Sequence, residues 1–246
     1  MTLTKKQIKL INSLHSKKGR SENHLFLVEG EKGLLELVKS SFKIQFIVLN
    51  EIFSNHEIVQ DNSDYCFFAS EIELNKYSTL VTNNFGLAVV EMPKQLEFHN
   101  PVGITVILDG IRDPGNLGTI IRICDWYGIG SIILSNDCTD FYNPKVISAS
   151  MGSFLRINHL YVDIVKWLSQ FPNVTKIGAL LNGDSLHTYT FPKTGFLVLG
   201  NESNGISKPV EDLIDDRVTI PSFGGAESLN VGISCAVFLD NLKRQF

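Results

Sequence analysis

From residue 104 to the end, the chain alternates short apolar runs with segments of helical character. Buried strands are expected at 104–108, 131–135, 175–181, 196–200 and 217–220. Helices are expected near 116–127, 143–151, 163–170 and 229–243. Strands that alternate with helices build a parallel sheet that is covered on both faces. The pattern therefore predicts an α/β fold for this part of the chain.

The first 91 residues form a second region of mixed structure. Thr4 and Gln7 have the spacing of a helix capping box, and Ile8, Ile11 and Leu14 follow at helical intervals. Beyond this helix we expect a loop at 16–20, strands at 25–28, 44–49, 65–69 and 86–91, and helices at 31–40 and from residue 70 on. Residues 92–103 hold two prolines and no clear period, which is typical of a linker. The sequence thus predicts two α/β domains, 1–95 and 103–246.

Composition excludes several classes of protein. At 246 residues and 43% hydrophobic, the chain can bury a full core, and no stretch approaches the ~18 apolar residues of a membrane span. The first residues lack the apolar core of a secretory signal, so we expect a cytosolic protein. The cysteines form no C-x-x-C pair, and the six histidines are scattered. We predict reduced, mostly buried thiols, no metal and no membrane association.

The charge is unevenly distributed along the chain. Residues 1–20 contain no acidic side chain and a local charge of +6, from Lys5, Lys6, Lys9, Lys17, Lys18 and Arg20. Because the whole chain carries −4, the remainder carries −10. A basic segment on an acidic body suggests a local contact with a polyanion such as RNA, since Lys and Arg gain affinity by releasing counterions from phosphates. A solvated helix face is the alternative that charge alone leaves open.

Three loops that follow predicted strands have unusual chemistry, and in open parallel sheets ligands bind beyond the carboxyl ends of the strands. The first loop, 108–122, carries two glycines, which allow a close approach of the backbone to a ligand, and Asn116, which could cap the helix or bind a ligand. Arg122 follows on an otherwise apolar helix. The spacing leaves open whether Arg122 is functional or forms a structural ion pair with Asp125 or Asp113.

The second loop, 200–207, begins as a P-loop does, but Ile206 stands where the phosphate-binding lysine should be. Glu202 would place a negative charge in the phosphate cradle. A nucleoside triphosphate is therefore disfavoured, and a cationic or hydroxyl-bearing ligand is favoured.

The third loop, 220–231, is rich in glycine and leads through Ser228 and Asn230 into an apolar helix. Its exposed backbone N–H groups could hold the carboxylate or the hydroxyls of a small ligand. Ordinary capping of the helix is the alternative.

Taken together, the three loops resemble the motifs of a known family. The segments D-P-G-N-L-G-x-x-x-R (113–122), L-V-L-G-N-E-S-N-G-I-S (197–207) and I-P-S-F-G-G-A-E-S-L-N-V (220–231) are similar in order and spacing to those of the SpoU family of RNA ribose methyltransferases, within the SPOUT superfamily. Residues 145–153 resemble the segment between motifs one and two. Residues 17–30 resemble the family's substrate-binding domain, which is related to a ribosomal-protein-like RNA-binding fold.

The resemblance implies an enzyme that transfers a methyl group from S-adenosyl-L-methionine to a ribose 2′-hydroxyl of ribosomal or transfer RNA. It also implies a parallel-sheet methyltransferase domain with a carboxyl-terminal trefoil knot, and a homodimer whose active site forms between the two copies. Catalytic or substrate-contacting positions of the family match Asn116, Arg122, Glu202, Ser228 and Asn230. Cofactor-contacting positions match Leu180, Gly200, Ile220 and Leu229. The basic residues expected to contact RNA are Lys17, Lys18 and Arg20.

Arg122 is not expected to act as a simple base, because a guanidinium stays protonated in proteins. We expect it to grip the target phosphate and to stabilise the developing alkoxide, while water relayed through Glu202 or Ser228 removes the proton. One position departs from the family, since Gly232 stands where a serine is usual. This departure leaves open an alternative function, a non-catalytic RNA-binding or ribosome-assembly factor with a degenerate methyltransferase fold.

Overall fold

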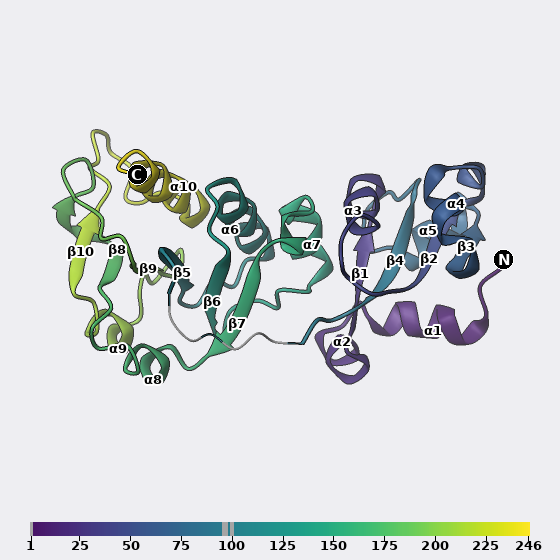
Figure 1. Ribbon diagram of the computed structural model, residues 1–246, viewed down its shortest axis with the longest axis horizontal. Helices are drawn as coiled ribbons and strands as arrows, with labels where there is room; N and C mark the ends of the chain where they lie inside the picture. Colours follow the sequence, from purple (N-terminus) through teal and green to yellow (C-terminus); the bar gives the residue numbers. More distant parts are fainter. Residues whose placement is uncertain (1, 95–97, 99–100) are drawn as a thin grey trace. The chain divides into compact units, whose positions relative to one another are not determined.

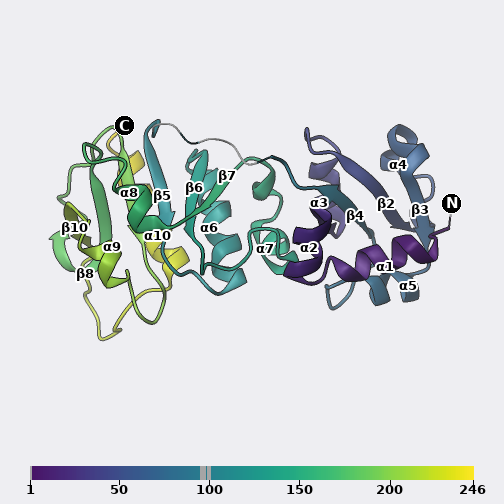
Figure 2. The same ribbon diagram turned by 90° about the horizontal axis from the view of Figure 1, so that it is seen from below.

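A computed structural model of the chain describes residues 2–94, 98 and 101–246. The chain divides into two compact units, Met1–Lys94 with Asp140–Leu155, and Gln95–Thr139 with Arg156–Phe246 (Figures 1 and 2). Residues 95–97 and 99–100 of the predicted linker lie outside the described residues. Within the described part of the chain, no helix is long and apolar enough to cross a membrane.

The first unit is built on a mixed sheet. Its strands are, in spatial order, β1 (Leu25–Glu29), β4 (Gly86–Glu91), β2 (Ile44–Asn50) and β3 (Cys66–Ala69). The β2–β3 pair is parallel, and the other two pairs are antiparallel. Its helices are α1 (Lys5–Ser13), α2 (Lys17–Asn23), α3 (Glu31–Leu37), α4 (Glu57–Asn62), α5 (Glu71–Tyr77) and α7 (Pro144–Ser150). Helices α1 and α5 cover one face, where Ile11, Leu14 and Leu74 form a core with Leu27 and Val48 of the strands.

Two capping boxes place helices of this unit where the sequence predicts them. Thr4 and Gln7 form one at α1, and Ser70 forms the other with Glu73 at α5. The loop predicted at 16–20 is wrong, because those residues begin α2. Ser16 starts this helix by accepting a 3.0 Å hydrogen bond at Oγ from the backbone N–H of Gly19. The short helix α4 was not predicted either.

The segment Asp140–Leu155 belongs to the first unit, although its place in the sequence assigned it to the second predicted domain. It carries α7, which packs against β1. Two of its aromatic rings, Tyr142 and Phe154, pack on Phe26 at centroid distances of 4.4 Å and 5.9 Å. These contacts join residues more than a hundred positions apart, so no local pattern predicts them.

The second unit contains a six-stranded parallel sheet, as the alternation of strands and helices predicts. Its strands are, in spatial order, β10 (Asp216–Thr219), β8 (Lys176–Ser185), β9 (Gly195–Leu199), β5 (Ile104–Leu108), β6 (Ser131–Ser135) and β7 (Asn158–Val162). Its helices are α6 (Pro114–Trp126), α8 (Ile164–Leu168), α9 (Lys208–Glu211) and α10 (Val231–Lys243). The sequence predicts neither β7 nor α9.

Helices cover both faces of this sheet. Helices α6 and α10 pack against each other on one face, and α8 and α9 lie on the other (Figures 1 and 2). On the α8–α9 face, Trp167 and Phe196 form part of a continuous core. Between α6 and α10, Cys124 and Cys235 are fully buried, and their hydrogen bond together with burial raises the pKa of the Cys124 thiol. All four cysteines, Cys66, Cys124, Cys138 and Cys235, are free and buried.

Candidate active site

The three unusual loops follow β5, β9 and β10 and meet at the carboxyl edge of the parallel sheet. Two hydrogen bonds fix the first loop to the second. Asn201 donates from Nδ2 to the carbonyl oxygen of Gly110 at 2.8 Å, and the backbone N–H of Ser207 donates to Oδ2 of Asp109 at 2.7 Å. The polar side chains of these loops are therefore held in a fixed relation to each other.

A tight turn in the second loop depends on two glycines. The backbone N–H groups of Asn201 and Gly205 each donate to the carbonyl oxygen of the other at 2.9 Å. Gly205 has a φ of +69°, a conformation that side chains other than glycine rarely adopt. A Cβ at Gly200 would lie 2.1 Å from the carbonyl carbon of Gly205, so only glycine fits there. The turn carries Glu202 at its exposed side.

A chain of hydrogen bonds links one side chain from each of the three loops. Asn116 donates from Nδ2 to Oε1 of Glu202 at 2.6 Å, and Asn230 donates from Nδ2 to Oδ1 of Asn116 at 2.9 Å. Oδ1 of Asn230 caps α10 by accepting from the backbone N–H groups of Gly232 and Ile233. The cap fixes the orientation of the Asn230 amide, which in turn fixes that of Asn116. Three residues singled out from the sequence are thus brought together.

Hydrogen bonds from the end of β6 and the turn that follows it hold the backbone of the first loop in place. Oγ of Ser135 accepts from the backbone N–H of Gly110 at 2.8 Å, and Sγ of Cys138 accepts from that of Ile111 at 3.2 Å. The Ser135 hydroxyl also donates to Asp137 at 2.5 Å. This hydrogen bond, with a smaller contribution from Arg112, holds the pKa of Asp137 below its ordinary value.

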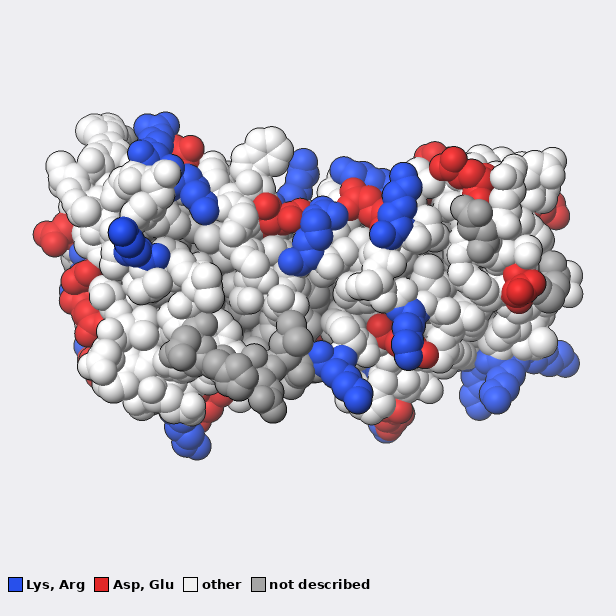
Figure 3. Space-filling model, in the orientation of Figure 1, with Lys and Arg blue, Asp and Glu red and all other residues white. Residues whose placement is uncertain are grey.

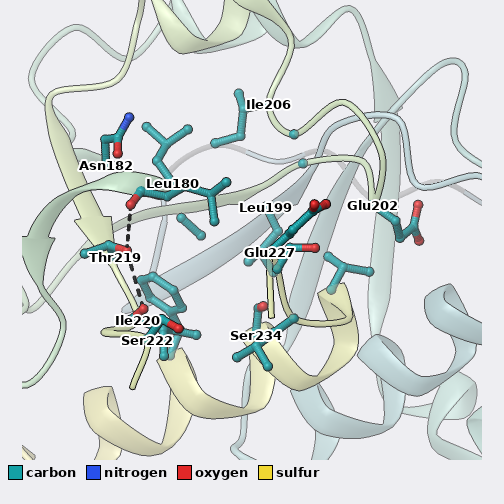
Figure 4. A pocket seen from close by; sticks show the side chains of 18 of the residues that line it. Leu180, Asn182, Leu199, Glu202, Ile206, Thr219, Ile220, Ser222, Glu227 and Ser234 are labelled. Carbon is teal, nitrogen blue, oxygen red and sulfur yellow. Dashed lines mark hydrogen bonds between the residues drawn. The ribbon is translucent and has the colours of Figure 1, made fainter. Parts of the chain in front are cut away.

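A cavity of about 850 Å³ lies between the second and third loops (Figure 4). Its wall includes all the residues expected to contact the cofactor, Leu180, Gly200, Ile220 and Leu229. Glu202 and Ser228 also line it. Sequence comparison by motif missed other lining residues, among them Leu199, Thr219, Phe223, Glu227 and Phe238. Most of these belong to the same strand ends and loops as the motif residues, and that position is the signal that could have indicated them.

The chemistry of the cavity wall fits S-adenosylmethionine better than a polyphosphate. Apolar side chains such as Leu180, Leu199 and Ile220 suit an adenosine group, and the glycine-bearing loops offer backbone N–H and C=O groups. Arg217 is the basic residue in the wall, and its guanidinium donates to Glu211 at 2.6 Å. Among the described residues, no group of three or more His, Cys, Asp or Glu could hold a metal ion.

Arg122 is not part of the hydrogen-bonded chain around Asn116. Six residues advance a helix by about one and two-thirds turns, so the two side chains leave α6 in different directions. The structural ion pairs considered for Arg122 are not formed, because Asp125 binds the guanidinium of Arg156 at 2.8 Å and Asp113 caps α6. Arg122 is exposed to solvent on the surface of α6.

The basic residues of the first unit differ in their exposure. Figure 3 shows blue side chains along the edge formed by α1, which carries Lys5, Lys6 and Lys9. Lys17 and Lys18 are also exposed. Arg20 is only 2% exposed, and its guanidinium donates to Asp140 at 2.5 Å and to the carbonyl oxygen of Leu14 at 2.8 Å. This burial corrects the expectation that Arg20 meets an RNA phosphate.

Comparison with known proteins agrees with this geometry. The family model described as the SpoU rRNA methylase family matches residues 103–240, more than half of the chain. The chain belongs to the SpoU rRNA methylase family. A second family model, the MRM3-like substrate binding domain, matches residues 5–85. The resemblance seen in the three motifs is thereby confirmed, and so is the enzyme class that it implies, an RNA methyltransferase.

Three relatives resemble this chain over nearly its whole length. A 23S rRNA (guanosine(2553)-2′-O)-methyltransferase of Bacillus subtilis is 28% identical over 96% of each chain. The solved structure of a member of the TrmH family from Porphyromonas gingivalis has a TM-score of 0.89 and 34% identity, and the match covers 100% of both chains. That of an AdoMet-bound rRNA methyltransferase from Sinorhizobium meliloti has a TM-score of 0.86 and 26% identity, and covers 99% of this chain and 97% of the other.

Proposed function

We propose that this chain transfers the methyl group of S-adenosyl-L-methionine to a ribose 2′-hydroxyl of ribosomal RNA. The observation that carries the proposal is the hydrogen-bonded chain Asn230–Asn116–Glu202, which reaches the wall of the cavity at Glu202. The relative from Bacillus subtilis acts on 23S rRNA, and the solved relative from Sinorhizobium meliloti is AdoMet-bound. An intact polar chain beside a cavity favours the enzyme over the non-catalytic alternative.

One set of residues would bind the cofactor, and another would position the reacting groups. When bound, S-adenosylmethionine supplies an electrophilic methyl group on a sulfonium. Leu180, Gly200, Ile220 and Leu229 would hold the adenosyl group, largely through apolar contact and backbone groups. Glu202, oriented by Asn116, would accept the hydroxyl proton through a water molecule, and alignment of the ribose oxygen would supply several kcal/mol of the barrier.

Arg122 would join the active site from a second copy of the chain. It lies on the exposed side of α6, one turn before Trp126, whose ring is 84% exposed. Ile233 of the neighbouring helix α10 is 52% exposed. An apolar surface of this kind beside an arginine suits an interface between copies. Docking there would allow the guanidinium of one copy to grip the RNA phosphate bound by the other.

The carboxyl-terminal trefoil knot and a cytosolic location complete the proposal. The knot is supported by the match to the SpoU family model over residues 103–240 and by the likeness in fold to solved members. The location is supported by relatives that act on ribosomal RNA.

A methyl-transfer assay tests the activity. The purified chain is incubated with radiolabelled S-adenosylmethionine and ribosomal RNA that lacks its natural modifications. We expect label in the RNA and a nucleotide that becomes resistant to alkaline hydrolysis, because 2′-O-methylation blocks attack by the 2′-oxygen. Transfer RNA serves as the parallel substrate. A chain that binds S-adenosylmethionine but labels neither RNA would contradict the proposal and favour the non-catalytic alternative.

Mixing two inactive variants tests the shared active site. Asn116→Ala disables the polar chain, and Arg122→Ala removes the guanidinium. If each active site uses Arg122 of one copy and Asn116 of the other, mixed dimers contain one site with both residues intact. We expect the mixture to regain about a quarter of the wild-type rate, the share set by random pairing of copies. A mixture as inactive as its components, although copies exchange, would place both residues in a single chain.

A further inference from the structure

The wall of the cavity contains an unpaired carboxylate that has no role in the proposed mechanism. The charged residues of the wall are Glu202, Glu211, Arg217 and Glu227. Glu211 and Arg217 neutralise each other in a 2.6 Å ion pair. Glu202 accepts from Asn116 at 2.6 Å and from Asn201 at 3.3 Å. Glu227 has no hydrogen bond or ion pair with any of the described residues, and Figure 4 shows its side chain directed into the cavity.

This arrangement leaves the cavity with two uncompensated negative charges. No basic side chain of the described wall offsets these two carboxylates, because Arg217 is already paired with Glu211. The hydrogen bonds of Glu202 come from neutral amides, which orient its charge without cancelling it. A cationic ligand would be attracted to these charges. The charge of the wall is therefore informative about which form of the ligand it prefers.

We infer that Glu227 makes the cavity select the sulfonium form of its ligand over the neutral thioether that remains after methyl transfer. The inference rests on the proposed function. Transfer breaks the S–CH₃ bond with its electron pair left on sulfur, forms the O–CH₃ bond, and passes the hydroxyl proton through water to Glu202, which then returns it to solvent. The product, S-adenosylhomocysteine, thus has one positive charge fewer than the substrate and nearly the same shape. A carboxylate beside the sulfonium would attract the substrate and hold the product less tightly.

Glu227 is better placed than Glu202 for this role. Asn116 and Asn201 both donate to the Glu202 carboxylate, which is committed to the polar chain. The oxygens of Glu227 have no donor among the described residues, so no hydrogen bond of the protein engages the charge that they present to the ligand. The residue also lies on the third loop directly before Ser228, which lines the same cavity.

Calorimetry with two ligands tests the inference in the full-length chain. The dissociation constants of S-adenosylmethionine and S-adenosylhomocysteine are measured for the wild type, for Glu227→Gln, which removes the charge at constant shape, and for Glu227→Asp, which keeps it. We expect Glu227→Gln to weaken S-adenosylmethionine binding about five- to tenfold, the scale of one partly solvated charge pair, and to leave S-adenosylhomocysteine binding unchanged. Glu227→Asp should retain most of the preference.

Two controls separate this effect from changes in net charge or folding. Glu57→Gln makes the same substitution on the exposed surface of α4 in the other unit, and both dissociation constants should stay at wild-type values. Unchanged S-adenosylhomocysteine binding is itself the evidence that Glu227→Gln is folded. In the wild type, raising the salt concentration should reduce the preference for the sulfonium, because Glu227 is exposed and its field is screened.

The remaining outcomes overturn the inference in distinguishable ways. If Glu227→Gln raised both dissociation constants equally, Glu227 would contribute to the shape of the cavity and would not distinguish the charged ligand from the neutral one. A wild type that binds both ligands equally, at low and at high salt, would remove the selectivity while the proposed function stands. A wild type that binds neither ligand would remove the proposed function as well.

Discussion

Asn116 donates a 2.6 Å hydrogen bond from Nδ2 to Oε1 of Glu202, and it accepts one of 2.9 Å at Oδ1 from Asn230. The amide therefore uses its donor side toward the carboxylate and its acceptor side toward the cap of α10. A side chain that offers only acceptors, or only donors, cannot replace it. The pair ties the beginning of α6 to the second loop, 86 residues further along the chain.

Asn116→Asp tests whether the side chain at this position must donate to Glu202 as well as accept from Asn230, because Asp has nearly the same shape as Asn but no N–H donor. The substitution places two carboxylates at hydrogen-bonding distance, and their repulsion should lower kcat/KM for RNA methylation about 100-fold. It should also raise the pKa of one carboxyl of the pair. Below that raised pKa, the protonated carboxyl donates to its neighbour as the amide did. The activity of the variant relative to wild type should therefore increase as the pH falls.

Asn116→Ala is the control for the pH effect. It removes the same hydrogen bonds without adding a carboxyl group, so its activity relative to wild type should not increase at low pH. Parallel pH profiles for the two variants would show that Asn116 does not act through Glu202.

Arg122→Lys tests the role of the guanidinium. The substitution keeps the charge but replaces a planar fork of donors by a single ammonium group. We expect kcat for RNA methylation to fall about 10- to 100-fold, because two aligned hydrogen bonds to a phosphate or alkoxide are lost. Binding of S-adenosylmethionine should be unchanged, since Arg122 does not line the cavity. A variant that methylates RNA at the wild-type rate would exclude the fork.

The sequence predicts those parts of the fold that have a local signal. Continuous apolar runs predict β5, β6 and β9, and capping boxes predict the starts of α1 and α5. Strand β7 was missed because its residues are exposed or half-buried at an edge of the sheet, so that it shows no continuous apolar run. Helix α2 was missed because a glycine within it suggests a turn. Gly19 is required because a Cβ there would lie 2.0 Å from the carbonyl oxygen of Ser13.

The candidate site shows the same division. The order of the motifs brings Asn116, Glu202 and Asn230 to one edge of the sheet, because the carboxyl ends of parallel strands meet there. No local pattern in the sequence predicts that a long basic side chain is buried. Arg20 is a basic residue in the same segment as the exposed Lys17 and Lys18. It is nevertheless buried and binds Asp140, which lies 120 residues away in the sequence.

Lys17→Ala/Lys18→Ala tests the basic segment as a phosphate contact. Both lysines are exposed, and each that meets a phosphate adds close to one unit to the slope of log affinity against log salt. We expect the double variant to bind RNA more weakly and to flatten this slope by about 1.5 to 2 units. The thermal stability of the chain should not change. An unchanged slope would exclude this pair from the RNA interface.

Arg20→Ala should lower the stability of the chain and leave the salt dependence of RNA binding unchanged. The side chain is buried, and its removal leaves Asp140 without the partner to which it is bound at 2.5 Å. We expect the free energy of unfolding to decrease by about 3 kcal/mol, as for other broken buried ion pairs. Chemical denaturation measures this loss. At temperatures where the variant is folded, the salt dependence of RNA binding should match that of the wild type.

Gly232→Ser tests the position at which the motif resemblance predicts a serine. A Cβ at Gly232 would lie 3.1 Å from Cγ2 of Thr119 and 3.2 Å from Oδ1 of Asn230, both closer than ordinary contact. We expect the substitution to destabilise the chain by about 1 kcal/mol, because α10 must shift away from α6. The same shift would pull the Asn230 amide from Asn116 and lower the rate of methylation.

Thr119→Ala separates crowding from any effect of the added hydroxyl. It removes the methyl group that the new Cβ would approach most closely, so Gly232→Ser should cost less in its presence. A double-mutant cycle from chemical denaturation should give a favourable coupling of about 0.5 to 1 kcal/mol. Activity should recover with stability, since both depend on the position of Asn230. Zero coupling would mean that α10 accommodates the serine without moving, and that glycine at this position is not required by its contact with α6.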